Sequence, residues 1–530
     1  MAQDSKQTNP SLASRASTTS AGAMAAAEPG EDGSPVAQPV SVDAALECAG
    51  GAGRFQKAYL VALGFPWMLS AMMTYSVVFN TRETAWHFLG ETGPPLEAQD
   101  KCQLARGAWA WDDPRLTTVA AFGLVCGRKS RVALLSTLFF FGAMLGLPVG
   151  GWWSDKRGRK EAFIVGTVIL QVPAAMSVWL PSYEIYAAAR FLFGFGQAVM
   201  DMTAFVLVTE VLGEQMASVP VWWMNSMFAI GQIAMSPLAM VMTHWRELNL
   251  AIAVLLATLL AVMCSLSESP KWLASQGRTS EAHKVLCRIA KVNKRPKPPP
   301  IAEPDLQITQ KQQTAGVGVL CDRRLTVRFV VSCITWFCVS AAFYGLGLSA
   351  GSIPLSLYAS NLLNGVVQVA GYVTGGYLIQ RHWCGRKGAV VGGFLVGGAC
   401  LLLSAFVRQK VVLLMFYYAG SFGVSTSFGV VFLYTAELFP TNVRGLALGI
   451  NSLFARVGAM LSPYVAVAGS INHTLPPLIF GVMCLVAGGL QVLLPETRGV
   501  KLPDTVDDIG RVPAEDNSDA SDSEADASSE

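Results

Sequence analysis

The sequence Gly151-Trp-Trp-Ser-Asp155-Lys-Arg-Gly158-Arg159-Lys160 separates two long apolar segments and decides the fold. Gly151 lets two helices approach closely, and Gly158 permits the chain to reverse direction. Asp155 can pair with a neighbouring helix end, and the cations around it hold the loop on the cytoplasmic side of a bilayer. The stretch therefore predicts a tight turn between two membrane-spanning helices.

The composition also indicates a membrane protein. Of the 530 residues, 52% are hydrophobic and only 14% are charged, which is too few charges for the surface of a soluble chain of this length. Apolar runs of roughly 20 residues cross about 30 Å of hydrocarbon, and twelve can be placed. The predicted fold is an all-α membrane protein of twelve transmembrane helices in two six-helix halves. The runs cover residues 58–80, 132–153, 162–180, 184–208, 219–242, 250–266, 329–348, 355–379, 389–407, 411–435, 446–468 and 478–494.

Charge and composition divide the chain into five regions. Lys and Arg gather in alternate loops, which predicts that both termini are cytoplasmic. The first forty residues lack an apolar core, so the first span is expected to act as the insertion signal. The regions are a disordered cytoplasmic tail (1–41), a six-helix half (42–266) with a large extracellular loop (81–130), a central cytoplasmic segment with a proline-rich linker (267–328), a second half (329–494) and an acidic cytoplasmic tail (495–530).

The long outward loop contains Cys102 and Cys126, the two cysteines placed in the oxidising compartment. They predict a disulfide, with two unpaired thiols as the alternative. The sequon Asn472-His-Thr474 lies in a short outward loop and predicts a glycosylation site at Asn472.

Motifs for enzymatic chemistry are missing from the sequence. No Gly-Lys dipeptide occurs, so the chain has no Walker A phosphate loop and is not an ATP-driven pump. There is no H-E-x-x-H, no Cys-x-x-Cys pair, and no G-x-S-x-G elbow placed between a strand and a helix. We expect no enzymatic activity, no cofactor, no metal site and no nucleic-acid partner.

Carboxylates beside cations recur at matching places in the two halves. Such pairs, each worth about 1 kcal/mol, predict a latch that closes the cytoplasmic side when the cavity faces outward. The alternative is a set of solvated helix ends. The predicted gating residues are Gly151, Asp155, Gly158 and Arg159 in the first loop, Glu210 at the end of span four, Glu268 and Lys271 after span six, Arg386 after span eight, Glu437 and Arg444 after span ten, and Glu496 and Arg498 after span twelve.

These motifs resemble those of the organic ion transporter family, solute carrier family twenty-two, within the major facilitator superfamily. The resemblance runs from about residue 42 to residue 508 and implies a plasma-membrane carrier that works by alternating access. It also implies that Arg190 makes polar contacts inside the first half rather than binding substrate. The matching stretches include Arg190-Phe-Leu-Phe-Gly194-Phe-Gly196, Phe343-Tyr344-Gly-Leu346 and Phe454-Ala-Arg456-Val-Gly458.

Arg456 is the main candidate for charge recognition. It lies about eleven residues into span eleven, roughly 16 Å from the cytosolic face, where an arginine costs at least about 3 kcal/mol unless it faces a cavity or a partner. In the resembling family, an arginine here is typical of anion and zwitterion carriers, and Gln368 occupies a position that is acidic in cation carriers. Asp201, at similar depth in span four, is a structural partner for Arg456, a ligand for a substrate amine, or a proton carrier.

Aromatic side chains are predicted to line the same cavity and to select a flat organic ion. Plain packing is the alternative for each of them. The candidates are Tyr75, Trp222 with its neighbour Trp223, Phe343, Tyr344 and Tyr372.

Two departures from the family pattern affect the latch. Ala217 stands where the family has an arginine seven residues after Glu210, and His382 stands where the motif would repeat Asp155. We expect an outward-facing state that is less favoured than in typical members, with a pH dependence contributed by His382.

The predicted function is secondary active or facilitative transport of small organic anions or zwitterions. The alternatives are an organic cation carrier that uses Asp201, and a membrane receptor or scaffold on the same fold that does not transport. A dicarboxylate, a proton or sodium is the expected exchanged or coupled ion. The sequence leaves the substrate and the oligomeric state open.

Overall fold

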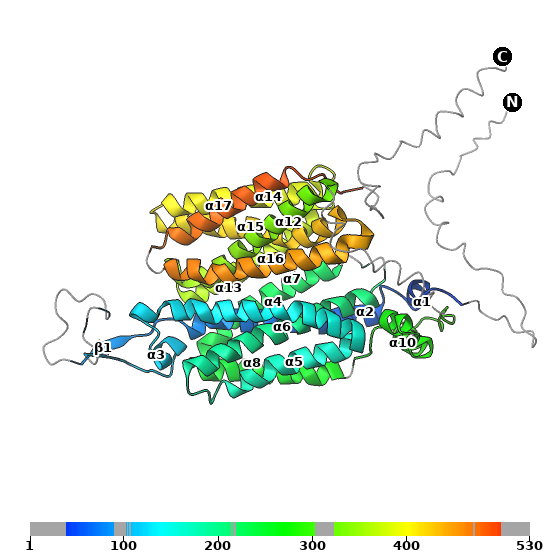
Figure 1. Ribbon diagram of the computed structural model, residues 1–530, viewed down its shortest axis with the longest axis horizontal. Coiled ribbons are helices and arrows are strands. Elements are labelled where there is room, and N and C mark those ends of the chain that lie inside the picture. The colour runs from blue at the N-terminus through cyan, green and yellow to red at the C-terminus, as the bar shows by residue number, and fades with distance from the viewer. Residues whose placement is uncertain are drawn as a thin grey trace, which may run out of the picture.

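The computed structural model is a bundle of long helices in two sets (Figure 1). It describes residues 39–89, 102, 104, 108–213, 216, 219–264, 266–302, 323–469 and 472–499. The predictions made for residues 1–38, for residues 500–530 and for Ala217 fall outside these ranges.

Within the described residues, twelve long helices form the bundle, six in each half, which confirms the predicted fold class. Eight are long and apolar enough to cross a membrane by length and composition alone. The first half contains α2 (Arg54–Asn80), α4 (Ser130–Arg157), α5 (Arg159–Met176), α6 (Tyr183–Val211), α7 (Val219–Val241) and α8 (Trp245–Cys264). The second contains α12 (Arg323–Leu348), α13 (Leu357–Leu378), α14 (Gly385–Phe406), α15 (Lys410–Leu438), α16 (Thr441–Ala468) and α17 (Leu475–Gln491).

Shorter elements lie at opposite ends of the bundle (Figure 1). We call the end with the loop between α2 and α4 the outer end, and the end with α10 the inner end. The outer elements are β1 (Trp86–Phe88), β2 (Trp109–Trp111), α3 (Thr118–Phe122), η2 (Cys126–Arg128) and η5 (Ser349–Ser352). The inner elements are α1 (Val42–Cys48), α9 (Pro270–Ser275) and α10 (Thr279–Asn293).

Within the first half, glycines let α4 and α6 pack backbone to backbone. A Cβ atom on Gly194 of α6 would lie 1.7 Å from the Phe139 carbonyl oxygen, and one on Gly142 of α4 would lie 2.0 Å from the Phe191 carbonyl oxygen. Helices in lipid associate through such close contacts because no hydrophobic force drives them together. Gly194 of the family motif is therefore a packing residue.

The two halves contact each other near the outer end. The Thr137 hydroxyl of α4 donates to the Met460 carbonyl of α16 at 3.0 Å. The Asn361 amide of α13 donates to the Gln232 carbonyl and to the Ser236 hydroxyl of α7, at 2.9 and 3.0 Å. These hydrogen bonds join the halves in the outer part of the bundle.

Replacing Gly194 with alanine tests the close packing of α4 and α6. Because the new Cβ would meet a backbone oxygen, the helices must separate, and we expect a loss of about 1–3 kcal/mol in the free energy of unfolding. The measurement is the melting temperature of the purified protein in detergent. The matched control is Gly392→Ala in α14, where a Cβ atom meets nothing within 4 Å and helix propensity improves. Equal melting temperatures for both variants would contradict the packing argument.

Candidate functional site

Arg456 of α16 lies in the middle of the bundle, at the seam between the halves. Its guanidinium interacts with the Tyr344 hydroxyl of α12 and with the carboxylate of Asp201 on α6. No ion pair within 4.0 Å joins Arg456 to Asp201. The structure therefore brings the two predicted charges to one site, one from each half, and leaves them apart.

The carboxylate of Asp201 is held from the first half. The Ser70 hydroxyl of α2 donates a short hydrogen bond to it, and Gln197, one turn earlier on α6, also interacts with it. The Trp67 indole of α2 donates to the Asp201 main-chain carbonyl at 3.2 Å. Neither Ser70 nor Trp67 was predicted, since nothing in the sequence distinguishes them from other residues of the first span.

Several buried polar atoms near Arg456 have no hydrogen-bond partner within the described protein. They are the hydroxyls of Tyr75 and Tyr372, the Gln368 side-chain oxygen and the Arg456 Nε. The side chain of Tyr75 lies close to those of Gln368 and Tyr372. Buried donors and acceptors are normally satisfied, so this cluster offers hydrogen bonds to a small polar molecule.

Aromatic rings enclose one side of this cluster. Phe343 stacks on Phe428 with ring centroids 4.4 Å apart, and Tyr344 lies 4.8 Å from Phe140 of α4. Phe228 of α7 contacts Tyr75, Phe343 and Tyr344. The rings of Phe140, Phe228 and Phe428 were not predicted, because among 26 phenylalanines no sequence signal separates a site ring from a packing ring.

Trp222 does not join this group of rings. It lies three residues into α7, is 40% exposed, and its ring contacts Trp223. Trp223 instead donates to the Leu60 carbonyl at 3.0 Å. The aromatic pair belongs to the inner end of α7 because helix geometry carries it away from the level of Phe228.

Arg190 is fully buried within the first half. Its guanidinium lies over the rings of Phe139 and Phe193, and its Nη1 is 3.5 Å from the Ser76 hydroxyl. These contacts place it among α2, α4 and α6, away from Arg456.

At the inner end of the first half, Arg159 is the centre of a charge network. Its Nη2 lies 2.8 Å from Glu210, and its Nη1 lies 2.9 Å from Asp155. Gly158 has φ of 109°, which favours glycine, and this reversal carries Arg159 back to α6. Both Arg159 and Glu210 are largely buried, with side-chain exposures of 11% and 18%.

The second half repeats the network. Arg386 pairs with Glu437 at 3.1 Å, after Gly385 with φ of 66°. Its Nη1 donates to the Ile379 carbonyl at 3.3 Å, whereas Arg159 Nη1 reaches both a carbonyl and Asp155. The position equivalent to Asp155 is held by His382, which is exposed.

Glu268 and Glu496 have roles that the sequence did not predict. Glu268 accepts hydrogen bonds from the backbone N–H groups of Arg159 and Lys160 at the start of α5. Glu496 does the same for Arg386 and Lys387 at the start of α14. Each carboxylate therefore satisfies free N–H groups at a helix N-terminus.

Lys271 forms an ion pair with Asp43 of α1 at 2.6 Å. Arg498 contacts Glu496 through its backbone N–H, and Arg444 Nε donates to the Phe439 carbonyl. Every ion pair described at the inner end joins residues of the same half. The two networks therefore shape each half separately and do not bridge the seam in this conformation.

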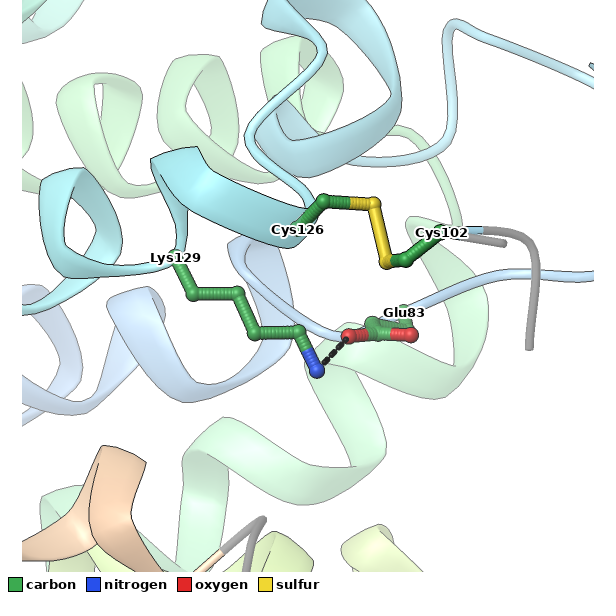
Figure 2. The surroundings of a disulfide bond; sticks show 4 residues. All are labelled: Glu83, Cys102, Cys126 and Lys129. Carbon is green, nitrogen blue, oxygen red and sulfur yellow. Dashed lines mark ion pairs between the residues drawn. A yellow bond between two sulfur atoms is a disulfide. The ribbon is translucent and has the colours of Figure 1, made fainter. Parts of the chain in front are cut away.

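At the outer end, Cys102 and Cys126 form a disulfide beside the Lys129–Glu83 ion pair, whose length is 3.3 Å (Figure 2). Lys129 and Glu83 line a crevice of about 770 Å³ between α2, α4, α12 and α16. The crevice reaches Leu348, one turn beyond Tyr344, and does not include the central cluster.

Asn472 is exposed between α16 and α17 at the outer end. Its side-chain oxygen accepts hydrogen bonds from the N–H and hydroxyl of Thr474, at 3.0 and 2.7 Å.

Comparisons with known proteins agree with this architecture. The chain matches the sugar (and other) transporter family over residues 94–506. Organic cation/carnitine transporter 4 of Arabidopsis thaliana is 32% identical over 487 residues, covering 88% of this chain and 90% of that protein. Solute carrier family 22 member 15 of Xenopus tropicalis is 30% identical over 440 residues, covering 80% and 81%. The inward open xylose transporter XylE from E. coli superposes with a TM-score of 0.61 at 17% identity, covering 84% of this chain and 98% of that structure.

Two six-helix halves and the match to the sugar (and other) transporter family define a multi-pass membrane transporter with the major facilitator fold. Within that class, the chain belongs to solute carrier family 22, part of the sugar (and other) transporter family. The resemblance drawn from the motifs is thereby confirmed at the level of the family.

The Arg159 network gives a stability prediction. Arg159→Ala leaves Glu210 largely buried without its partner, and we expect a loss of about 2 kcal/mol or more in the free energy of unfolding. The matched control is Lys156→Ala in the same loop, whose cation lies over the exposed ring of Trp152 and should matter little. Melting temperatures of the purified variants provide the measurement. A melting temperature for Arg159→Ala as high as that of Lys156→Ala would show that the network is not a stabilising element.

Proposed function

We propose that the protein carries small organic zwitterions by alternating access, with Arg456 binding the carboxylate of the substrate and Asp201 binding its ammonium group. The observation that supports this is the placement of the two charges: they come from opposite halves, share one site and do not pair. An ion held between them would connect the halves, as an alternating-access carrier requires. The unpartnered hydroxyls of Tyr75 and Tyr372 supply additional hydrogen bonds.

The names of the relatives fit this substrate class. Two similar proteins, from Arabidopsis thaliana and from human, are named organic cation/carnitine transporters. Carnitine carries a quaternary ammonium group and a carboxylate. The rings of Phe343, Tyr344 and Phe428 suit such an ammonium group, because aromatic faces attract cations. An organic anion would use Arg456 alone, and an organic cation would use Asp201 alone.

We assign the inner networks to the gate on the cytoplasmic side. In the present conformation the hydrogen bonds across the seam lie near the outer end, at Thr137 and Asn361. The Arg159 and Arg386 networks each remain within one half. A gate that closes the inner side therefore requires new contacts between the two inner surfaces.

We assign the outer end to the extracellular side of the plasma membrane and both termini to the cytoplasm. The disulfide and the sequon residue Asn472 lie at the outer end, and both belong to oxidising, luminal or extracellular surfaces. The cation-rich loop at Arg159 lies at the inner end, as the positive-inside rule requires.

Uptake of labelled probes tests the substrate assignment. Cells expressing the wild type should take up L-carnitine, and both Arg456→Ala and Asp201→Asn should reduce this uptake at least tenfold at matched surface expression. A tenfold loss corresponds to about 1.4 kcal/mol, a modest value for a hydrogen-bonded charge pair. The matched control is Arg408→Ala, an exposed arginine between α14 and α15.

Probes of single charge separate the alternatives. Uptake of para-aminohippurate that depends on Arg456 alone would indicate an anion carrier, and uptake of tetraethylammonium that depends on Asp201 alone would indicate a cation carrier. If well-expressed wild-type protein takes up none of the three probes, the receptor or scaffold function takes the place of transport.

The orientation has a separate test. Cys48 is exposed at the inner end, so a membrane-impermeant maleimide should label it only after cells are permeabilised. The signal from Cys48 is the difference between the wild type and Cys48→Ser. Asn472→Cys at the outer end should add labelling in intact cells. Labelling of Cys48 in intact cells would reverse the assigned topology.

A further inference from the structure

The surroundings of Asp201 pose an electrostatic problem when no substrate is bound. The residue lies nine residues before Glu210, which at 1.5 Å per residue is roughly 13 Å from the inner network. Its carboxylate receives a hydrogen bond from Ser70 and a weaker interaction from Gln197. Neither group carries a charge.

Arg456 is the nearest cation to Asp201, and it is not in contact with it. Tyr344 interacts with both charges. The remaining charged groups of the elements around α6 are distant: Asp155 of α4 and Arg159 of α5 belong to the inner network. Helix α2 contributes only Ser70 and Trp67 to Asp201, and no charged group of α7 or α9 appears among its described interactions.

An ionised carboxylate at this depth is costly unless a cation contacts it. Two species can remove the cost. One is a proton on the carboxylate, and the other is the ammonium group of a bound substrate. Both neutralise the same oxygens, so they cannot occupy Asp201 together.

We propose that Asp201 is a proton-binding site in the substrate-free protein and that a substrate ammonium group displaces the proton, so that the carrier exchanges substrate for protons. This inference rests on the proposed function and specifies its coupling ion. When substrate binds, the O–H bond of the Asp201 carboxyl breaks, the proton passes to a water molecule, and the carboxylate pairs with the ammonium group. No covalent bond to the substrate forms.

Exchange follows from this competition. On the side where substrate is released, Asp201 regains a proton before the empty carrier turns over, because an unpaired carboxylate opposes closure of the site around it. Each cycle therefore moves one substrate in one direction and one proton in the other. Arg456 stays charged throughout and holds the carboxylate of a zwitterion.

The protonation step can be measured without transport. Infrared difference spectra of the purified full-length protein, titrated with pH, should show the C=O band of a protonated carboxyl that is lost in Asp201→Asn. The matched control is Glu184→Gln, an acid with 73% side-chain exposure near the outer end of α6, and it should leave this band unchanged. Melting temperatures of the variants establish that each is folded.

Ligand competition completes the test. At a pH where the band is present, saturating L-carnitine or choline should remove at least half of it, and para-aminohippurate, which has no ammonium group, should leave it intact. A band that is absent from the wild type, or that persists in Asp201→Asn, overturns the proton site. A band insensitive to L-carnitine and to choline overturns the exchange.

The spectra separate this inference from the transport assignment. If the band titrates and responds to choline while cells take up no probe, proton binding at Asp201 holds and the proposed function fails. If uptake depends on Arg456 and Asp201 but the band is absent, the function holds and proton exchange fails. If proton binding and transport both hold, substrate flux should change the internal pH of wild-type proteoliposomes loaded with a pH-sensitive dye. Proteoliposomes that contain Asp201→Asn should show no such change.

Discussion

The cost of placing charge in hydrocarbon is the constraint on which the rest of the structure depends. Arg456 and Asp201 lie within the bundle, where each unpaired charge costs several kcal/mol. They are nevertheless held apart, and the surrounding hydroxyls of Tyr75 and Tyr372 are left without partners. A purely structural ion pair would have closed this gap. The separation therefore distinguishes this arrangement from a structural ion pair.

The packing of the helices keeps Arg456 and Asp201 apart at the boundary between the two halves. Within each half, helices approach closely at glycines, as α4 and α6 do at Gly194, and this makes each half a compact unit. The inner networks centred on Arg159 and Arg386 strengthen each unit at its most exposed turn. The hydrogen bonds between the halves lie near the outer end, at Asn361 for example. In alternating access the two halves rock against each other around a central site, which requires rigid halves with weak contacts between them.

The repeated loop shows what sequence reasoning could and could not reach. The turn glycine Gly158 and the cations after it were predicted from the sequence, because helix reversal and membrane orientation are local properties. The partners of Glu268 were not predicted. Its carboxylate reaches across to the start of α5, where it accepts hydrogen bonds from free N–H groups of the backbone.

By itself, the sequence determined the number of spans, the two halves, the family and the identity of the charged residues inside the membrane. These follow from hydrophobic length, charge placement and short motifs, all of which are set by neighbours along the chain. Only the tertiary structure decided that Asp201 and Arg456 share a site without pairing, that Phe140, Phe228 and Phe428 join Tyr344, and that Trp222 does not. Those outcomes depend on the rotation of each helix about its axis, which is fixed by packing between segments hundreds of residues apart.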